Sequence, residues 1–387
     1  MKKIQDTDTQ NKKALVRVDY NVPMKDGVVV DNERIKASLE TIKYLVGNGS
    51  AVILCSHLGR PEGRQNALFS LEPVAKELEK LIKINVQFIN NCIGNERDDK
   101  VQNLKAGEIL LLENVRFYPE EEENNQSFAK KLSSGCDLYV NDAFSASHRD
   151  HASIVAVTKY LDSFAGFCLQ KEVENLSKVL IEPKRPMVLV LGGAKVSDKI
   201  TLLENLIDKI DTLILGGAIA NTFLLASGLE TKKSVVEVNS IEVARKILEK
   251  ASYKNIDVFL PDDVLVGDSV DDTSGESKQV SQLTPNEMIL DIGESTIFLD
   301  SNALQFAETI FWNGPMGYSE NPVFSNGTIS IGKAITSSSA FSVIGGGDTI
   351  ATIPEYMKGK FGYISMAGGA TLEFLSGEIL PGIKVLE

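Results

Sequence analysis

Residues 187–199, MVLVLGGAKVSDK, place two adjacent glycines and two lysines at the end of an apolar run. The apolar run is typical of a buried parallel strand that leads into a helix. Gly192 and Gly193 would let backbone N–H groups approach an anion, and the helix start would add partial positive charge. On that helix, Lys195 and Lys199 would share one face because they are four residues apart. The stretch predicts phosphate binding; a tight turn with solvated lysines is the alternative, since the spacing is not that of a Walker A loop.

Polar and basic side chains follow the apolar runs of the first half of the chain. Guanidinium groups bind phosphate and carboxylate in a bidentate manner, so several arginines and a histidine would form a site for a small polyanion. A surface ion pair could explain any one arginine, but four at equivalent strand ends favour a common site. The residues are Asp19, Asn21, Arg34, His57, Arg60, Arg116, His148 and Arg149.

Glycines follow the apolar runs of the second half: Gly192 and Gly193, Gly216 and Gly217, and residues 345–347. Such positions suit a nucleotide, whose phosphates need backbone donors and whose base needs a slot without side chains. Asp348 comes directly after the last of them and is a hard oxygen ligand of the kind that Mg²⁺ prefers. It could also cap the next helix, and the two roles do not exclude each other.

These side chains need a scaffold that brings strand ends together. Apolar, β-branched runs alternate with amphipathic helical patterns along the whole chain, which predicts right-handed βαβ crossovers and mostly parallel sheets. A helical pattern, LQKEVENLSKVLIE, is closed by Pro183 and Pro186, so a domain joint is expected within residues 170–186. We predict an α/β fold of two doubly wound, Rossmann-like parallel-sheet domains joined by a hinge helix.

Composition agrees with two domains and narrows the function. The chain has 387 residues, more than the roughly 250–300 at which single cores stop growing. With 40 Lys and Arg against 53 Asp and Glu, a nucleic-acid-binding protein is disfavoured. The scattered cysteines predict buried, reduced thiols, and they keep no zinc-site spacing with the histidines. No leader-like or membrane-spanning run is present, so we expect a soluble cytoplasmic protein that binds no membrane.

Three features have structural explanations. The acidic run Glu120–Glu123 is predicted to be solvated, because consecutive carboxylates on a polar loop usually are. His151 and Trp312 could equally be explained by packing in the core.

Taken together, these motifs resemble the phosphoglycerate kinase family over essentially the whole chain. The matching stretches occur in family order: RVDYNVP, SHLGRPEG, LLLENVRFY, YVNDAF, LGGAKVSDKI, FWNGPMG, GGGDT and TLEFLSGEILPG. The resemblance implies a glycolytic kinase that moves a phosphoryl group reversibly from 1,3-bisphosphoglycerate to ADP, giving 3-phosphoglycerate and ATP. It further implies Mg²⁺, direct in-line transfer, hinge-bending closure of the domains, and a cytoplasmic monomer.

The resemblance also implies roles for individual residues. The acid substrate would be held by Asp19, Asn21, Arg34, His57, Arg60, Arg116 and Arg149. The nucleotide would be held by Gly192, Gly193, Ala194, Lys195, Lys199, Gly216, Gly217, Asn313, Glu320, Gly346, Gly347, Asp348 and Thr349. Glu320 would bind the ribose, Asp348 the metal, and Arg34, Lys195 and Lys199 would be catalytic, with Arg34 and Lys195 meeting on the transferring phosphoryl group.

The implied domains are residues 1–169 for the acid substrate, 170–186 as hinge helix and linker, and 187–370 for the nucleotide. Residues 371–387 would return to the first domain.

The chain departs from the family pattern at a few positions near the predicted sites. They include Ala218, Met366, Ala367, Ser145 and Asp150. These changes leave open a non-catalytic nucleotide-binding protein on the same scaffold, which would bind nucleotide without turnover. A dinucleotide dehydrogenase would need a G-x-G-x-x-G turn with an acidic residue about 20 residues later, and none of the glycine pairs has that spacing.

Overall fold

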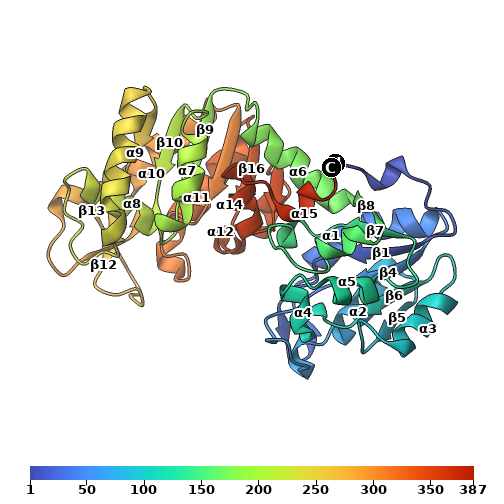
Figure 1. The fold of residues 1–387 in the computed structure, drawn as a ribbon. Helices are drawn as coiled ribbons and strands as arrows, with labels where there is room; N and C mark the ends of the chain where they lie inside the picture. The colour runs from blue at the N-terminus through green and yellow to red at the C-terminus, as the bar shows by residue number, and fades with distance from the viewer. The chain divides into compact units, whose positions relative to one another are not determined.

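The computed structural model describes residues 1–387 and divides into two compact units, each built around its own parallel sheet (Figure 1). Unit 1 comprises Met1–Glu174 and Ile379–Glu387, and unit 2 comprises Asn175–Glu378. The boundary falls inside helix α6 (Phe167–Leu180). The predicted fold class, two doubly wound parallel-sheet domains, is confirmed.

The sheet of unit 1 has six parallel strands in the order β5-β6-β4-β1-β7-β8. Their bounds are β1 (Lys13–Arg17), β4 (Ala51–Cys55), β5 (Val86–Ile89), β6 (Ile109–Leu112), β7 (Leu138–Asn141) and β8 (Asp162–Ala165). The strand order reverses at β1, which pairs with β4 on one side and β7 on the other. Ligands of open α/β sheets bind at the carboxyl ends of strands beside such a reversal.

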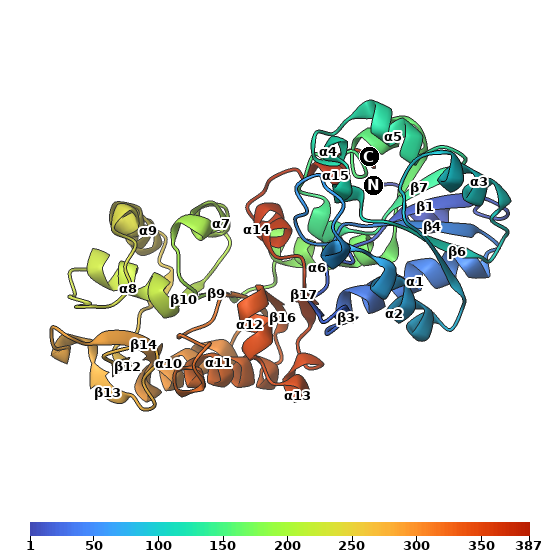
Figure 2. The ribbon, with the colours of Figure 1, turned by 90° about the horizontal axis from the view of Figure 1, so that it is seen from below.

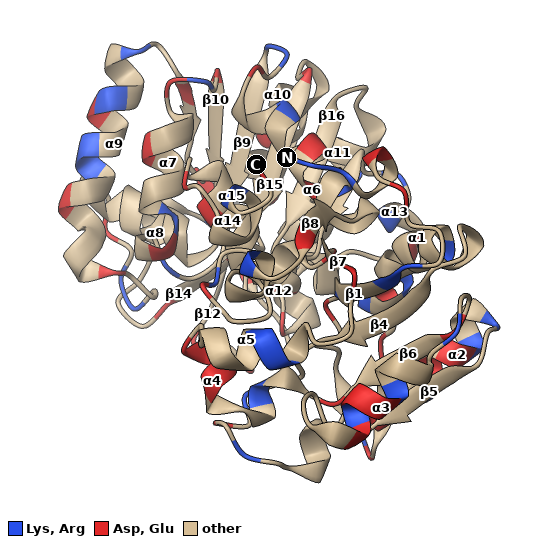
Figure 3. Cartoon of the chain, turned by 45° about the vertical axis from the view of Figure 1, so that its right-hand side comes forward, with Lys and Arg blue, Asp and Glu red and all other residues tan.

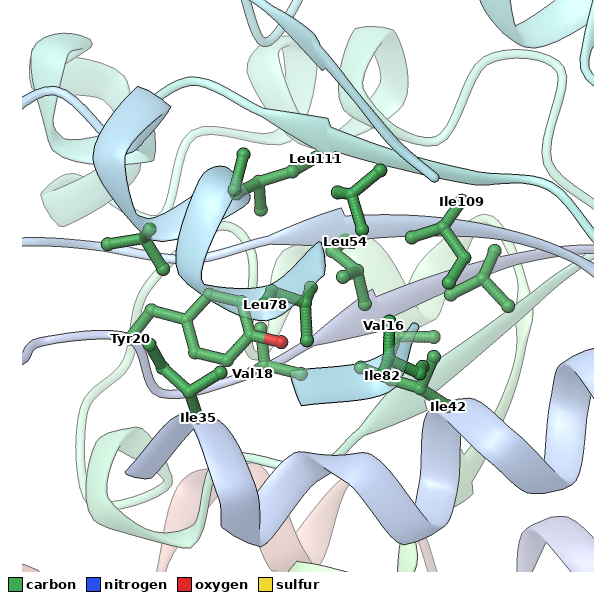
Figure 4. Close-up of a cluster of buried hydrophobic side chains, with 14 of the residues drawn as sticks. Val16, Val18, Tyr20, Ile35, Ile42, Leu54, Leu78, Ile82, Ile109 and Leu111 are labelled. Atoms are coloured by element: carbon green, nitrogen blue, oxygen red, sulfur yellow. The ribbon is translucent and has the colours of Figure 1, made fainter. Parts of the chain in front are cut away.

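Both faces of this sheet are covered, as the continuous apolar runs require. Alternate residues of β1 point to opposite faces, so Val16 belongs to one core cluster and Leu15 to another. Figure 4 shows the first cluster, in which Ile35 and Ile42 of α1 (Glu33–Gly47) lie on the strand residues. Leu78 of α2 (Glu72–Ile82) joins them, because its helix repeats apolar residues every four positions.

The remaining elements of unit 1 are its helices and a small hairpin. Its helices are α1 (Glu33–Gly47), α2 (Glu72–Ile82), α3 (Asn95–Asn103), α4 (Pro119–Glu122), α5 (Gln126–Leu132) and α15 (Pro381–Lys384), and a small hairpin joins β2 (Met24–Lys25) to β3 (Val28–Val29). The C-terminal segment is attached to the loop after β7. Gly382 N–H donates to the Ser147 carbonyl over 2.8 Å, and its own carbonyl accepts from Asn141 Nδ2 over 3.1 Å.

The sheet of unit 2 also has six parallel strands, in the order β11-β10-β9-β15-β16-β17. Their bounds are β9 (Met187–Leu191), β10 (Thr212–Leu215), β11 (Asp257–Phe259), β15 (Thr309–Asn313), β16 (Phe341–Gly345) and β17 (Tyr363–Ser365). Here the order reverses at β9, between β10 and β15. The ends of β9 and β15 are therefore the expected ligand position in this unit.

Helices cover both faces of this second sheet. Figure 2 shows α7, α8 and α9 on one side of it and α10 and α11 on the other. The helix bounds are α7 (Ile200–Leu206), α8 (Gly217–Ala226), α9 (Ile241–Tyr253), α10 (Glu294–Gln305), α11 (Asn326–Ser337), α12 (Gly347–Thr352), α13 (Glu355–Lys358) and α14 (Gly369–Leu375). Trp312 is fully buried in the core beneath α11, and His151 of unit 1 is also buried, which agrees with packing in the core.

One element of unit 2 was not anticipated. Between β11 and α10 the chain forms a three-stranded antiparallel sheet in the order β13-β12-β14. Its strands are β12 (Asp263–Gly267), β13 (Glu276–Gln279) and β14 (Met288–Ile292). The sheet matters for function because β14 lines a pocket described below.

The surface carries charges of both signs. Figure 3 shows acidic and basic residues alternating along α3 and α9. All of the cysteines are free thiols; Cys55 and Cys92 are buried, whereas Cys136 and Cys168 are only partly so. None of the helices combines the length and the apolar character needed to cross a membrane.

Candidate functional site

The end of β1 brings three of the predicted substrate residues into one hydrogen-bonded group. Asp19 Oδ1 accepts from the Asn21 backbone N–H over 3.0 Å. Asp19 Oδ2 accepts from Arg34 Nη1 over 2.8 Å and from Ser145 Oγ over 2.5 Å. Arg34 also donates to the Asn21 carbonyl over 3.1 Å. Ser145 lies in the loop after β7. The segments that follow the neighbouring strands β1 and β7 are therefore hydrogen-bonded to each other at Asp19.

The loop after β4 connects this group to Arg116. Gly59 N–H donates to Asn21 Oδ1 over 2.9 Å, and the Gly59 carbonyl accepts from Arg116 Nη1 over 2.8 Å. Gly59 has φ +62°, and a Cβ there would lie 2.4 Å from the Phe69 ring. Only glycine fits such a position without strain. Arg116 is buried and forms an ion pair with Glu122 over 3.1 Å.

His57, at the end of β4, contacts an arginine that the sequence analysis did not assign to the site. Arg17, the last residue of β1, is 1% exposed and places Nη2 3.1 Å from His57 Nδ1. The sequence does give one indication of Arg17: it is the only cation inside the apolar run ALVRVDY. A charge buried at such a position needs a specific partner.

Positive charge dominates this region. The pKa of His57 is held well below its usual range, first by burial and then by the neighbouring Arg17 and Arg116. Burial and the proximity of Arg17 also lower the pKa of Arg116. Such mutual repulsion is relieved when a polyanion binds, so the electrostatics suit a phosphorylated acid.

Arg60 and Arg149 complete the predicted set and differ from the others. Both are exposed, and neither guanidinium makes a hydrogen bond or an ion pair within the protein. Asp150, which could have neutralised its neighbour Arg149, instead accepts from Asn124 Nδ2 over 2.6 Å. Both guanidinium groups are therefore available to a ligand.

The interpretation of the acidic run as merely solvated is wrong for part of it. Glu121 is fully buried. Its carboxylate accepts hydrogen bonds from the backbone N–H and the hydroxyl of Ser153, over 2.9 and 2.6 Å, which offset the cost of burying it. Glu122 is the ion-pair partner of Arg116. No local pattern separates these two from their neighbours, since short-range charge runs carry no information about tertiary partners.

In unit 2 the glycines after β9 and β10 do not offer free N–H groups as predicted. The amide of Gly192 donates to the Asn313 carbonyl over 3.0 Å, that of Gly193 to the Pro315 carbonyl over 2.7 Å, and that of Gly217 to the Met316 carbonyl over 2.7 Å. A Cβ on Gly192 would lie 2.0 Å from the Pro315 carbonyl oxygen. These glycines let the strand-end turns pack against one another.

The two lysines do not share a helix face, contrary to the prediction. Helix α7 begins only at Ile200, so Lys195 lies exposed in the preceding turn. Lys199 is buried, and its ammonium donates to the carbonyls of Gly192 over 2.6 Å and Asn313 over 2.8 Å. Burial lowers the pKa of Lys199 to about 7, and the nearby Asp198 and Asp348 oppose that shift.

Free backbone donors occur instead at the start of α12, after β16. Gly346, with φ +96°, precedes the helix, and the N–H groups of Gly347, Asp348 and Thr349 have no hydrogen-bond partner within the protein. Thr349 Oγ1 accepts from the Gly314 N–H over 2.9 Å, which attaches this turn to the end of β15. Asp348 is exposed in the first turn rather than at the N-cap.

A pocket of about 270 Å³ lies beside these turns. Its wall is mostly apolar, a combination typical of small-molecule sites. Predicted nucleotide residues that line it are Gly193, Ala194, Gly217, Glu320 and Asp348. Other lining residues were not predicted, among them Met288 and Leu290 of β14 and the turn residues Met316 and Tyr318. Ala218 also lines the pocket, so its methyl group contributes to the wall.

Asp348 fits a magnesium ion that arrives with a nucleotide. No group of three or more His, Cys, Asp or Glu side chains is placed to hold a metal ion. Mg²⁺ commonly uses only one or two carboxylates, with phosphates and water as its remaining ligands. An exposed carboxylate at the mouth of a pocket meets that requirement.

Comparisons with known proteins agree with this arrangement. The family model described as phosphoglycerate kinase matches residues 4–378. The chain belongs to the phosphoglycerate kinase family. Phosphoglycerate kinases of Moorella thermoacetica and Dictyoglomus turgidum are each 46% identical to it, over 99% of this chain and 98% of theirs.

Solved structures of the family have the same fold. The phosphoglycerate kinase of Coxiella burnetii superposes with a TM-score of 0.90 at 43% identity, covering 99% of this chain and 98% of that one. The Pyrococcus horikoshii enzyme gives 0.88 at 34% identity, covering 100% and 98%. The chain is therefore a glycolytic phosphoglycerate kinase, and no observation favours the non-catalytic alternative.

Proposed function

We propose that unit 1 binds 3-phosphoglycerate or 1,3-bisphosphoglycerate and unit 2 binds ADP or ATP, with Mg²⁺, for reversible phosphoryl transfer between them. The observation that carries the proposal is the contrast between the two strand-end regions. Unit 1 presents several neighbouring cations, which together with burial lower the pKa of His57, and unit 2 presents an apolar pocket beside free backbone N–H groups.

On the acid side, two groups of residues divide the work. Asp19, Asn21, Arg34, His57 and Arg116 are already held by the protein and would orient the carboxylate and hydroxyl end of the acid. Arg60 and Arg149 have free guanidinium groups, which would close on the phosphate of the bound molecule. Because most of these side chains are already held in place, only Arg60 and Arg149 would lose conformational entropy when the acid binds.

On the nucleotide side, the base would enter the apolar pocket and Glu320 would accept from the ribose hydroxyls. The phosphates would extend toward the N–H groups of Gly347, Asp348 and Thr349 and toward Lys195. Gly192, Gly193, Gly216, Gly217 and Asn313 would shape the walls rather than donate hydrogen bonds. Asp348 would hold Mg²⁺, which offsets phosphate charge when it is bound.

Phosphoryl transfer needs positioning and charge stabilisation more than covalent chemistry. Arg34 and Lys195 would stabilise the charge on the transferring group. Lys199 would do so only after leaving its two carbonyl acceptors, which makes it a residue whose contacts change on nucleotide binding. Closure of the domains, with residues 170–186 as the hinge, would exclude water and so prevent hydrolysis of ATP.

For the domain bounds, the cellular location and the oligomeric state, we propose what the resemblance to the family implies. We propose residues 1–169 and 187–370 as the two substrate domains and a cytoplasmic monomer as the active form. Residues 371–387 are proposed as the C-terminal segment, of which the last part, Ile379–Glu387, belongs to unit 1.

The direct test is ATP-dependent phosphorylation of 3-phosphoglycerate with Mg²⁺, comparing the natural protein with Lys195→Ala. Lys246→Ala, on the exposed face of α9, is the matched control because it removes the same charge elsewhere in unit 2. We expect robust turnover in the natural protein and the control and severe loss in Lys195→Ala. Equal turnover in all three would remove Lys195 from the catalytic set.

A further inference from the structure

Arg17 and His57 form a contact that determines where the imidazole carries its proton. Arg17 Nη2 lies 3.1 Å from His57 Nδ1, and both residues are buried. A guanidinium group can only donate hydrogen bonds. His57 Nδ1 must therefore be the acceptor, which leaves the proton of the neutral ring on Nε2.

The opposite edge of the ring is open to a ligand. His57 Nε2 makes no hydrogen bond within the protein, yet it is not sealed away from solvent. In this tautomer Nε2 is a donor, which is the polarity that a carboxylate or phosphate oxygen requires. An Nδ1–H tautomer would present a lone pair to an anion.

Arg17 is itself held in place by further bonds. Its Nε donates to Ser153 Oγ over 2.9 Å, and its Nη1 donates to the Val18 carbonyl over 2.5 Å. Ser153 Oγ in turn donates to Glu121 Oε1 over 2.6 Å. The chain Glu121–Ser153–Arg17–His57 is buried along its length, so a negative charge is placed near the buried guanidinium without touching the imidazole.

We propose that Arg17, held by Ser153 and Glu121, is a positioning residue that fixes His57 as the Nε2–H tautomer and so presents an N–H donor to the acid substrate. The substrate part of this inference rests on the proposed function of His57. The tautomer part concerns the free protein alone.

The charges around His57 act in the same direction. Arg17 on β1, Arg34 on α1, Arg116 after β6 and the neighbouring His151 all disfavour a second proton on the ring, and burial does so more strongly. His57 is accordingly expected to remain neutral from about pH 5 to pH 8, where an ordinary histidine titrates.

The first test is nitrogen-15 NMR of the imidazole groups in the full-length, ligand-free protein. The chain has 3 histidines, so each signal can be assigned with single His→Gln variants. We expect His57 to show a protonated Nε2 and an unprotonated Nδ1 that do not titrate in this range. A protonated Nδ1, or an imidazolium at neutral pH, would overturn the proposal.

Variants then separate positioning from general destabilisation. Arg17→Lys loses the fork that reaches both His57 and Ser153. Ser153→Ala removes the hydroxyl that accepts from Arg17 Nε and donates to Glu121, but it leaves the contact between Arg17 and His57 in place. Arg97→Lys is the matched control, because Arg97 is also fully buried in unit 1 but donates to the carbonyl of Leu132. All three lose packing, but only the first two should change the His57 nitrogen signals.

Kinetics provide the second readout. We expect the KM for 3-phosphoglycerate to rise about tenfold in Arg17→Lys, consistent with weakening of one hydrogen bond to a charged group, and less in Ser153→Ala. The KM for ATP should not change, nor should either KM in Arg97→Lys. If Arg17→Lys left both the signals and the KM for 3-phosphoglycerate unaltered, Arg17 would not be a positioning residue.

The proposed function can fail separately. If His57→Gln left the KM for 3-phosphoglycerate unchanged while the His57 signals of the natural protein still responded to Arg17→Lys, His57 would not be a substrate ligand. The substrate part of the inference would then be overturned, and control of the tautomer by Arg17 would be supported.

Discussion

The two strand-reversal regions of this molecule differ in what holds them together, although both lie at the carboxyl ends of a six-stranded parallel sheet. At β1 in unit 1, charged side chains converge and are held by one another, so the site is specified by side-chain types. At β9 in unit 2, the turns are held by backbone hydrogen bonds, and the absence of side chains creates the pocket. A small polyanion requires directed charge, whereas a nucleotide requires a flat apolar slot and a few donors for its phosphates.

The comparison predicts which substitutions affect chemistry and which affect folding. In unit 1, removing a charged side chain should reduce function while the backbone stays intact. In unit 2, adding a single methyl group to the turn after β9 should destabilise the fold.

The largest effect is expected for Arg34→Ala. Arg34 bonds Asp19 and is proposed to stabilise the transferring phosphoryl group, so we expect kcat to fall by about 10³-fold, the lower end of arginine contributions to phosphoryl transfer. Steady-state assays with saturating ATP and 3-phosphoglycerate measure it. Lys36→Ala, an exposed cation on the same helix, should retain normal turnover. Undiminished kcat in Arg34→Ala would contradict the proposed role.

Next comes a pair of glycine substitutions in unit 2. In Gly192→Ala the new Cβ would meet the Pro315 carbonyl oxygen at 2.0 Å, so unfolding should become easier by about 3 kcal/mol. In Gly347→Ala nothing lies within 4 Å of the new atom, so stability should change little and only the KM for ATP should rise. Fluorescence of the single tryptophan, Trp312, follows unfolding of unit 2 directly. Equal stability of the two variants would contradict the structural role of Gly192.

The two lysines after β9 provide a smaller contrast. Lys199→Met removes the hydrogen bonds of the ammonium group to the carbonyls of Gly192 and Asn313, of which only the Asn313 carbonyl keeps another donor, and this should cost about 1–3 kcal/mol of stability in the absence of ligand. Lys195→Ala, at an exposed position, should change stability by less than about 0.5 kcal/mol. Urea unfolding of both variants measures the difference. A larger loss of stability in Lys195→Ala than in Lys199→Met would contradict the structural role of Lys199.

The smallest effect concerns Asp300 on α10, which is not among the residues that line the pocket. Burial raises its pKa to about 8, and its Oδ2 is buried without a partner. Between about pH 4 and pH 8 the folded state keeps a proton that the unfolded state has released, so this carboxyl makes stability fall as pH rises.

Asp300→Asn should remove that dependence. The gain in unfolding free energy relative to the natural protein should grow with pH by at most about 1.4 kcal/mol per unit. Asp271→Asn, at an exposed position, is the control and should show no such trend. A gain that stays constant from pH 5 to pH 8 would show that Asp300 is ionised in the folded protein.

Much of this architecture was predictable from the sequence because parallel strands with two buried faces leave long apolar runs. Those runs placed the strand ends, and the strand ends placed Asp19, His57, Arg116 and the glycines correctly around two reversals. The antiparallel sheet β12–β14 was not predicted, since its strands are short and partly exposed. The part of the pocket wall that β14 contributes was therefore not predicted either.

Contacts between segments far apart in the sequence could not be predicted either. Nothing local distinguishes Glu121 from Glu120, and burial of Glu121 depends on Ser153, which is brought near only by the fold. Likewise, four-residue spacing predicted a shared helix face for Lys195 and Lys199, but α7 starts too late. For Arg17 the sequence did give an indication, a single charge within an apolar run. It did not indicate that His57 would be its partner.

One titration tests the division of labour between the two units most directly. All of the histidines lie in unit 1 and the only tryptophan lies in unit 2, so their NMR signals report the two sites separately. We predict that 3-phosphoglycerate shifts the His57 signals and leaves the Trp312 indole unchanged, and that Mg²⁺ with ADP does the reverse. If 3-phosphoglycerate shifted Trp312 without affecting His57, the assignment of the acid site to unit 1 would be wrong.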